Sequence, residues 1–308
     1  MSKEKRKIAV VTGSSTGIGF ETSLGLARKG FITCATMRDV KKSKNLENIV
    51  RNENLPMKVF ELDVNDDNSV NTAIASIIHE YGHVDILVNN AGYGLFGGLE
   101  DFSMAEIKNQ FETNVFGVMR VIRNVLPIMR QQKSGLIINI SSMSELAGIP
   151  SQSAYSATKF AVEGMSEALS YELEPFGIKV VLIEPGVINT EFVQGLVVPS
   201  KKYESDKNWD QTSQFNDKND KNGSSSFYND TIKKFLTFYY KAMKEAPHPR
   251  IVAYEIVHKI ENIYDESNTA ASSIQRITVG TDSKKYSKLK KDLTDNEFHT
   301  LLKSDLLN

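Results

Sequence analysis

Short runs of aliphatic residues alternate with longer stretches of helical character through the first two-thirds of this chain. Each run is mostly continuous rather than interrupted by polar residues at every second position, which is typical of strands buried on both faces of a sheet. The runs lie at Ile8–Val11, Phe31–Ala35, Lys58–Leu62, Val84–Val88, Leu136–Ile140 and Lys179–Ile183. The stretches between them are long enough for crossover helices. The pattern therefore predicts parallel βαβ units and an α/β fold, with Arg276–Gly280 as a last short strand.

Two long helices are predicted after the fourth aliphatic run. Ser103 and Glu106 have the spacing of a capping box, and apolar residues then recur at helical intervals, so we expect a helix over about 103–131. A second helix is expected over about 153–174. Asn114 is a poor helix former on the apolar face of the first helix. It either satisfies a local break in the helix or orders a water molecule that relays protons.

Composition excludes several classes of protein. Lys and Arg number 37 against 38 Asp and Glu, a net charge of −1, so the chain lacks the basic excess expected of a protein that binds nucleic acid. Cys34 is the only cysteine, which rules out an intrachain disulfide and a cysteine-rich metal site. No apolar run approaches the roughly 18 residues that a membrane span requires, and none forms a signal-peptide core. We expect a soluble, cytoplasmic protein that holds no metal ion.

A polar segment interrupts the alternation from Pro199 to Thr231. It contains no Ala, Val, Ile, Leu or Met, and its large apolar side chains are a few aromatics. Such a composition is typical of a disordered surface insertion, but long loops beside active sites also act as mobile lids. Both interpretations stay open, and we refer to residues 199–231 as the lid-like insertion.

A glycine-rich turn, TGSSTGIG, spans Thr12–Gly19 between the first predicted strand and the first predicted helix. Glycines let the backbone turn tightly and approach a pyrophosphate, while the free N–H groups at a helix N-terminus bind its negative charge. The glycine spacing, GxxxGxG, differs from the commoner GxGxxG, but the position of the turn after a strand predicts a dinucleotide site. The predicted contacts are Gly13, Ser15, Thr16, Gly17, Ile18 and Gly19.

Polar and small residues also follow the ends of other predicted strands. Asp63 comes after the third strand, and Asn90, Ala91 and Gly92 come after the fourth. In an open parallel sheet, ligands bind beyond the carboxyl ends of the strands, so these residues face the same crevice as the glycine-rich turn. Small residues at 91 and 92 let a cofactor lie close to the backbone. We predict that all four residues contact the dinucleotide.

The residue after the second predicted strand decides which dinucleotide binds. An acidic side chain there accepts a hydrogen bond from the ribose of NAD, whereas an Arg accommodates the 2′-phosphate of NADP. With a strand over Phe31–Thr36, Arg38 takes this position and predicts NADP. Asp39 follows at once, so a strand that ended one residue later would favour Asp39 and NAD. NADP is the prediction, and NAD is the alternative.

Tyr155 and Lys159 lie four residues apart on the second predicted long helix, which places them on one face. A tyrosine phenol has a pKa of about 10, and a neighbouring ammonium lowers it toward the range useful for general acid–base catalysis. Ser142 comes just after the fifth strand, where its hydroxyl can donate to a carbonyl oxygen that gains negative charge. Taken alone, a Tyr-x-x-x-Lys pair is more simply explained as surface decoration.

Taken together, these residues resemble the short-chain dehydrogenase/reductase family. Seven elements match in order and at suitable spacing: TGSSTGIG at Thr12–Gly19, LDV at Leu62–Val64, NNAG at Asn89–Gly92, Asn114, Ser142, YSATK at Tyr155–Lys159 and PGVINT at Pro185–Thr190. The resemblance implies a single Rossmann-like domain with a doubly wound parallel sheet of about seven strands. We assign this domain to residues 5–280, with the lid-like insertion inside it, and we assign residues 281–308 to a C-terminal helical appendage.

The resemblance also implies roles for individual residues. The implied catalytic tetrad is Asn114, Ser142, Tyr155 and Lys159. The further implied contacts to the cofactor are Val64, Tyr155, Lys159, Pro185, Gly186, Ile188 and Thr190. A family site of this kind transfers a hydride between NADP(H) and a secondary alcohol or ketone. The likeness to hydroxysteroid- and retinol-type dehydrogenases implies an apolar small-molecule substrate.

Two other functions are compatible with a dinucleotide site. A non-catalytic redox sensor or scaffold would bind the cofactor without turnover, but it would need no proton donor. An epimerase or dehydratase acting on a nucleotide-sugar would carry a TGxxGxxG turn in place of the spacing found in this sequence. Family members often pair through the helices predicted at about 103–131 and 153–174, so the resemblance also implies a homodimer or homotetramer.

Overall fold

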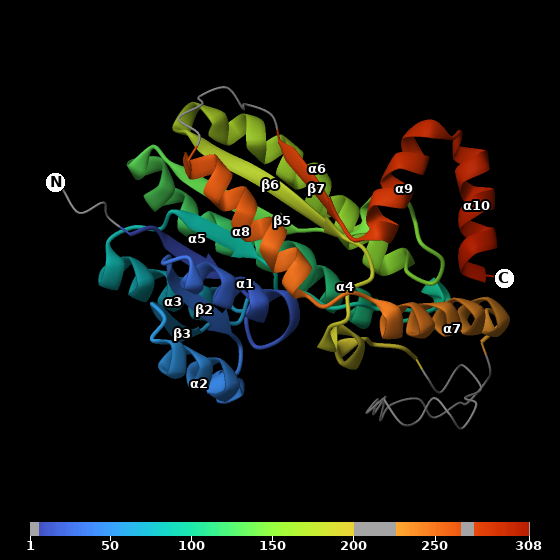
Figure 1. Ribbon diagram of the computed structural model, residues 1–308. Coiled ribbons are helices and arrows are strands. Elements are labelled where there is room, and N and C mark those ends of the chain that lie inside the picture. Colours follow the sequence, from blue (N-terminus) through green and yellow to red (C-terminus); the bar gives the residue numbers. More distant parts are fainter. Residues whose placement is uncertain (1–5, 200–225, 266–273, 308) are drawn as a thin grey trace.

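Seven parallel strands form a single sheet at the centre of the computed structural model (Figure 1), which describes residues 6–199, 226–265 and 274–307. The strands in chain order are β1 (Ile8–Val11), β2 (Ile32–Met37), β3 (Met57–Glu61), β4 (Ile86–Asn89), β5 (Gly135–Ile140), β6 (Ile178–Pro185) and β7 (Gln275–Val279). Their order across the sheet is β3-β2-β1-β4-β5-β6-β7. Val10 of β1 pairs with Cys34 of β2 on one side and with Leu87 of β4 on the other. The predicted doubly wound, Rossmann-like sheet is confirmed.

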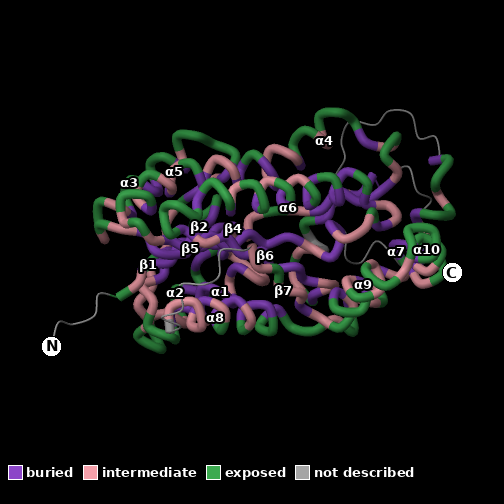
Figure 2. Tube along the Cα trace, turned by 90° about the horizontal axis from the view of Figure 1, so that it is seen from above, coloured by how far each residue is buried: buried purple, intermediate pink, exposed green. Residues whose placement is uncertain are grey.

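The continuous aliphatic runs become strands with an apolar core on each side. Successive residues of a strand point to opposite faces of the sheet. Ile8 and Val10 accordingly belong to one core, and Ala9 and Val11 belong to the other. β1, β4 and β5 are buried along their whole length, and Figure 2 shows this buried layer between partly exposed helices.

Helices cover both faces of the sheet. The core that contains Val10 is covered by α3 (Asp67–Tyr81), α5 (Gly117–Gln132) and α6 (Ser153–Leu173). The opposite core is covered by α1 (Gly17–Arg28) and α8 (Arg250–Asp265). A smaller core lies at the β2–β3 edge under α2 (Lys44–Glu53).

The first long helix predicted from the sequence is interrupted. It begins with the expected capping box, in which Glu106 N donates to the Ser103 hydroxyl and Ser103 N donates to the Glu106 carboxylate. After α4 (Met104–Phe111), a π-helical turn (Glu112–Phe116) leads into α5. Asn114 lies within this turn, so the local break is present where a polar residue interrupts the apolar face.

Most strand boundaries differ from the prediction by one or two residues, and two of them bear on the site and on the C-terminal helices. β2 extends to Met37, one residue past its expected end, because Met37 still pairs with Glu61 of β3. β7 begins and ends one residue before the predicted Arg276–Gly280. Gly280 is not part of the strand, since its φ of 101° turns the chain toward the next helix.

Helices after the lid-like insertion gather beside the sheet (Figure 1). α7 (Asn229–Glu245) begins within the last three residues of the insertion, at Asn229. Residues 200–225 of the insertion lie outside the described residues, and its two interpretations stay open. The C-terminal segment forms α9 (Thr281–Asp292) and α10 (Asp295–Leu307), and α10 shares an apolar core with α7. Among the described residues, no helix is long and apolar enough to cross a membrane.

Candidate active site

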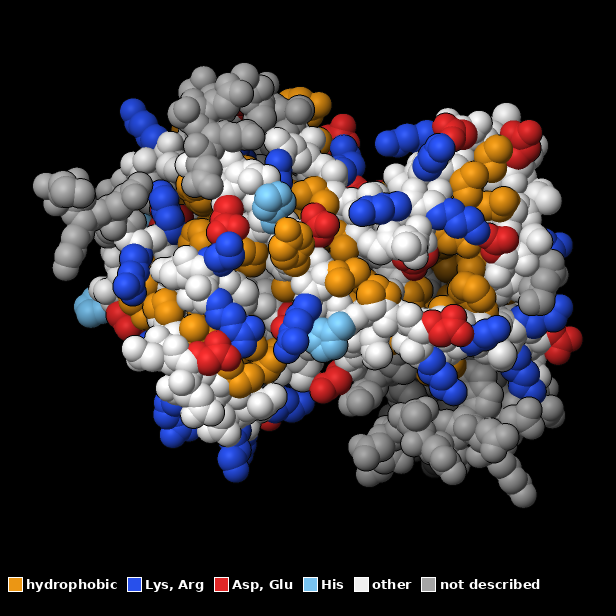
Figure 3. All heavy atoms as spheres, in the orientation of Figure 1, with side chains coloured by type: hydrophobic (Ala, Val, Ile, Leu, Met, Phe, Trp, Pro, Cys, Tyr) orange, Lys and Arg blue, Asp and Glu red, His pale blue; other side chains and the backbone are white. Residues whose placement is uncertain are grey.

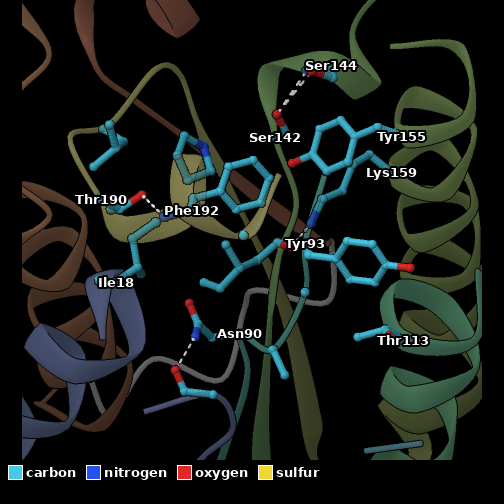
Figure 4. Close-up of a pocket in the computed structure, with 18 of the residues that line it drawn as sticks. Ile18, Asn90, Tyr93, Thr113, Ser142, Ser144, Tyr155, Lys159, Thr190 and Phe192 are labelled. Atoms are coloured by element: carbon cyan, nitrogen blue, oxygen red, sulfur yellow. Dashed lines mark hydrogen bonds between the residues drawn. The ribbon is translucent and has the colours of Figure 1, made fainter. Parts of the chain in front are cut away.

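A cavity of about 540 Å³ opens where the strands end, and Figure 4 shows side chains from several elements converging on it. It lies at the switch point between β1 and β4, from which the strand order runs in opposite directions. The predicted site residues that line it are Gly13, Ser15, Thr16, Gly17, Ile18, Arg38, Asp63, Val64, Asn90, Ala91, Gly92, Ser142, Tyr155, Lys159, Pro185, Gly186, Ile188 and Thr190. Gly19 and Asn114 lie behind these residues and are not part of the lining.

Asn90 holds the glycine-rich turn in place. Its Nδ2 donates to the carbonyl oxygens of Thr12 and Gly13 at 3.0 and 3.1 Å. A Cβ atom on Gly19 would lie 2.4 Å from both Asn90 Nδ2 and Gly13 O, so this close approach requires glycine. The N-cap residue of α1, Thr16, makes no side-chain hydrogen bond to the helix end. The first N–H groups of α1 therefore face the cavity without a capping side chain, as in sites that bind a pyrophosphate.

Arg38 lines the cavity immediately after β2. β2 ends at Met37, one residue later than predicted. From the sequence alone, this later end favours Asp39 as the residue that meets the ribose. The Asp39 carboxylate, however, accepts a hydrogen bond from Lys41 N at 3.0 Å and caps a short helical turn. Arg38 lines the cavity, and Asp39 does not.

Tyr155 and Lys159 project into the cavity from the first turns of α6, as their spacing predicts (Figure 4). Lys159 Nζ donates to the carbonyl oxygen of Ile140, the last residue of β5, at 2.8 Å. The same nitrogen lies 5.6 Å from the centre of the Tyr155 ring. Ser142, two residues beyond β5, places its hydroxyl beside the Tyr155 phenol (Figure 4). The end of one strand and the start of one helix thus bring the three side chains together.

Burial determines the proton affinity of the Tyr155 phenol. The ring centres of Phe96 and Phe192 lie 5.8 and 5.9 Å from that of Tyr155. Loss of solvent around the phenolate raises the pKa of Tyr155 to about 12, and the hydrogen bond with Ser142 opposes this rise in part. The phenol therefore keeps its proton at neutral pH, which is the state a proton donor needs.

The prediction that Lys159 lowers the pKa of Tyr155 is wrong for this structure. The Lys159 ammonium is directed at the Ile140 carbonyl, and the effect of burial on Tyr155 is larger than any effect of this charge. Burial also acts on Lys159 itself and lowers its pKa to about 8, while the nearby Glu163 carboxylate raises it in part. Both groups are thus shifted toward their neutral forms.

Ser142 is held by two residues that the sequence analysis missed. Its hydroxyl donates to Ser144 Oγ at 3.3 Å, and the Ser144 hydroxyl donates in turn to Gln152 Oε1 at 2.8 Å. Ser144 N donates back to Ser142 Oγ at 3.2 Å. A Ser-x-Ser turn is a known local hydrogen-bonding pattern and marks Ser144 in the sequence. No sequence signal marks Gln152, because it comes from the turn before α6.

Asn114 is buried in the π-helical turn and does not line the cavity, but it bonds with Tyr93, which does. Its Oδ1 accepts from Tyr93 N at 3.1 Å, and its Nδ2 donates to Tyr93 O at 2.9 Å. The same Nδ2 donates to Thr158 Oγ1 at 3.2 Å, and the Thr158 hydroxyl donates to the Tyr155 carbonyl at 2.7 Å. Asn114 therefore links the π-helical turn, the segment after β4 and the start of α6.

Aromatic side chains form one wall of the cavity next to Tyr155. This aromatic wall consists of Phe96, Phe192, Phe235 and Tyr239. The ring centre of Phe96 lies 5.1 Å from that of Tyr239 and 5.9 Å from that of Phe235, both on α7. Leu306 of α10 also lines the cavity. In Figure 3, hydrophobic side chains gather in a hollow beside the C-terminal helices, at the right of the view. This end of the cavity fits an apolar molecule.

An acidic cluster includes a side chain of α6, the helix that carries Tyr155 and Lys159. It consists of Glu145, Glu163 and Glu184 around the guanidinium of Arg276. Arg276 Nε lies 3.1 Å from Glu163 Oε2 and 3.8 Å from Glu184 Oε1. The three carboxylates lie within 4.8 Å of one another, close enough for a cation, and Arg276 already supplies a positive charge there. Burial raises the pKa of Glu145 to about 8 and that of Glu184 to about 7, and nearby carboxylates add to both shifts.

The fold and these residues define a candidate dinucleotide site at the ends of a parallel sheet, and comparison with known proteins identifies the family. Residues 7–200 match the family model for the short chain dehydrogenase. This match covers more than half of the chain, and the chain belongs to that family. The protein is therefore a member of the short-chain dehydrogenase/reductase family.

Two curated relatives and one solved structure show what the chain is similar to. It is 44% identical over 186 residues to a 3-ketodihydrosphingosine reductase of Bacteroides thetaiotaomicron. The matched region covers 60% of this chain and 65% of that protein. It is 42% identical over 191 residues to retinol dehydrogenase 8 of Homo sapiens, and the matched region covers 60% of each chain. The match thus spans less than two thirds of either relative. A metagenomic short-chain oxidoreductase solved in complex with NADP is 30% identical, with a TM-score of 0.57, and covers 59% of this chain and 83% of that one.

The acidic cluster predicts a stability that falls as pH rises. Burial raises the pKa of Glu145 from 4.5 to about 8 in the folded chain, so the folded state binds more protons than the unfolded state between these values. The contribution of Glu145 to the free energy of unfolding is fully present below its pKa in the unfolded chain and is lost as pH rises through its pKa in the folded chain. The loss is up to about 1.4 kcal/mol per pH unit for each proton. Glu145→Gln cannot ionise, so it is expected to flatten this decline and to unfold at higher urea concentration than the wild type at about pH 8.

Urea unfolding at several pH values between about 5 and 8 measures this effect. Glu172→Gln is the matched control, because Glu172 is an exposed glutamate on the same helix, α6, and should leave the slope unchanged. Identical pH slopes for Glu145→Gln and the wild type would contradict the assignment of the buried carboxyl group.

Proposed function

We propose that this protein transfers a hydride reversibly between NADP(H) and an apolar secondary alcohol or ketone. The observation that carries the proposal is the position of Tyr155. Its protonated phenol, beside the Ser142 hydroxyl, lies in one cavity that has the glycine-rich turn at one end and the aromatic wall at the other. A proton donor between an anion site and an apolar site is what carbonyl reduction requires.

The residues at the glycine end of the cavity fit a dinucleotide. The N-terminus of α1 provides N–H donors for a pyrophosphate, and the Arg38 guanidinium provides a forked donor for a 2′-phosphate. Asp63 offers a carboxylate on the same wall. Bound there, the nicotinamide ring supplies the hydride, and the protein supplies position and electrostatics. The NADP complex of the metagenomic relative supports this choice of cofactor.

The chain's own residues manage the proton. In reduction, the Tyr155 hydroxyl donates its proton to the substrate's carbonyl oxygen, and the Ser142 hydroxyl donates a hydrogen bond to the same oxygen. Lys159, anchored on the Ile140 carbonyl beside the phenol, would contact the bound cofactor, as the family resemblance implies. Asn114 holds the Tyr93 segment against the start of α6. A water molecule ordered by Asn114 would relay protons between the phenol and solvent. In oxidation, the same groups act in the reverse direction.

The other end of the cavity supports an apolar substrate. The aromatic wall and Leu306 offer contact area but few polar partners. The names of the two relatives, a retinol dehydrogenase and a ketodihydrosphingosine reductase, favour the same class of substrate. The raised pKa of Tyr239, a consequence of its burial, keeps that phenol neutral beside the substrate.

We further propose that the protein forms a homodimer or homotetramer through α5 and α6. Phe160 and Tyr171 on α6 are 48% and 65% exposed, and Phe116, at the start of α5, is 49% exposed. The two α6 residues are 171 − 160 = 11 positions apart, about three helical turns, so they share a face. Light scattering should report a dimer or tetramer for the wild type and a smaller species for Phe160→Glu. A monomeric wild type would contradict this proposal.

Tyr155→Phe tests the catalytic assignment. The variant lacks the transferable proton but keeps the ring, so we expect the binding of NADPH to change by no more than a few-fold while the rate falls by about 10²–10⁴. Consumption of NADPH with a panel of small polar and large apolar ketones measures the rate. Tyr171→Phe, on an exposed position of the same helix, is the control and should behave as the wild type. Near-normal turnover by Tyr155→Phe would exclude it as donor, and wild-type binding of NADPH without turnover would favour the redox sensor.

Arg38→Ala tests the cofactor preference. The wild type is expected to use NADPH at least tenfold more efficiently than NADH, judged by kcat/KM, and the variant should lose this advantage, about 1.4 kcal/mol or more. Asp39→Ala is the neighbouring control, because Asp39 caps a helical turn and should leave the ratio unchanged. A wild type that prefers NADH would reassign the ribose contact to Asp39.

A further inference from the structure

β6 and β7 end side by side, and the segments that follow them stay in contact. Pro185 pairs in register with Val279, and Gly186 N donates to Val279 O at 2.8 Å. After β6 the chain continues as residues 185–190, most of which line the cavity. After β7 it turns into α9. The first turn of the C-terminal helices therefore lies behind the segment that the family resemblance assigns to the cofactor.

The Asp282 carboxylate bridges these two segments. Its Oδ2 accepts a hydrogen bond from Val187 N at 2.6 Å, and its Oδ1 accepts one from Ser283 N at 2.9 Å. A Cβ atom on Gly186 would lie only 1.9 Å from Asp282 Oδ1. The carboxylate thus occupies the space that any side chain at position 186 would take. This contact gives a physical reason for glycine after Pro185.

A second contact makes the junction rigid. Ser283 is fully buried, and its hydroxyl donates to the carbonyl oxygen of Glu184 at 2.7 Å. Glu184 is still in β6, whereas Val187 lies beyond the end of that strand. The Val187 N–H group therefore has no strand partner at that point and donates to a carboxylate instead, a stronger acceptor than a neutral carbonyl.

We propose that Asp282 is a positioning residue for the cofactor: it fixes the backbone of Gly186 and Val187, and so the place where residues 185–190 meet the dinucleotide. The inference rests on the cofactor site of the proposed function. Asp282 does not line the cavity, so it acts only through this segment. The competing interpretation is that Asp282 merely stabilises α9 by a negative charge at the helix N-terminus. In that case its loss lowers stability and leaves cofactor binding unchanged.

Asp282→Ala and Asp305→Ala form a matched pair of variants. Asp305 also lies in the C-terminal helices, but its carboxylate accepts from Lys285 and Tyr286 and makes no contact with residues 185–190 among its described hydrogen bonds. We expect both variants to lower Tm. Asp282→Ala should also weaken NADPH binding by about tenfold or more in a fluorescence titration, while Asp305→Ala should stay within about twofold of the wild type. Equal binding by the two variants would overturn the proposal.

Hydrogen exchange supplies a second readout that needs no cofactor. Peptides over residues 184–192 should exchange faster in Asp282→Ala than in Asp305→Ala or the wild type, because Val187 N–H has lost its acceptor. Unchanged exchange would overturn the proposal. Asp282→Asn keeps an oxygen acceptor without the charge and should give a smaller change in both measurements, so it serves if the alanine variant does not fold. A wild type that binds neither NADPH nor NADH would refute the proposed function instead, and the exchange result would still stand by itself.

Discussion

The contact between Asn90 and the glycine-rich turn is the constraint on which the rest of the site depends. Asn90 donates from its side chain to the turn, and the backbone N–H groups of Asn90 and Ala91 both donate to the Thr12 hydroxyl. These bonds are possible only because β1 and β4 are neighbours in the sheet. The turn is held from the segment after β4, and its backbone stays close to the cavity. The anion site is therefore a consequence of strand order.

The proposed catalytic groups depend on the sheet in a similar way. The Lys159 ammonium is anchored on the last carbonyl of β5, and Ser142 comes two residues later on the same chain segment. A site built from the end of a buried strand and a long helix keeps its geometry better than one built from loops. The same burial explains why Tyr155 holds its proton and why Lys159 loses its proton more easily than an exposed lysine.

The sequence predicted the parts of the fold that depend on local patterns. Continuous aliphatic runs such as Ile8–Val11 became strands, the Ser103–Glu106 capping box formed, and the residues beyond the strand ends met at one cavity. It could not predict contacts between distant segments. The aromatic wall is assembled from α7 and from loops far apart in the chain, so no period or motif marks it. The effect of Lys159 on Tyr155 was misjudged because spacing gives proximity but not burial or the direction of an ammonium.

The π-helical turn at Glu112–Phe116 has a consequence for the length of this segment. A π-helical turn holds one residue more than an α-helical turn, and each residue advances a helix by about 100°. Removing one residue there would restore a regular helix but rotate all of α5 by about 100° relative to α4. The buried face of α5, with Val121 and Val125, would then leave the sheet, or Asn114 would turn away from Tyr93. The extra residue thus sets the rotation of α5 relative to α4, so that α5 packs against the sheet while Asn114 still bonds with Tyr93.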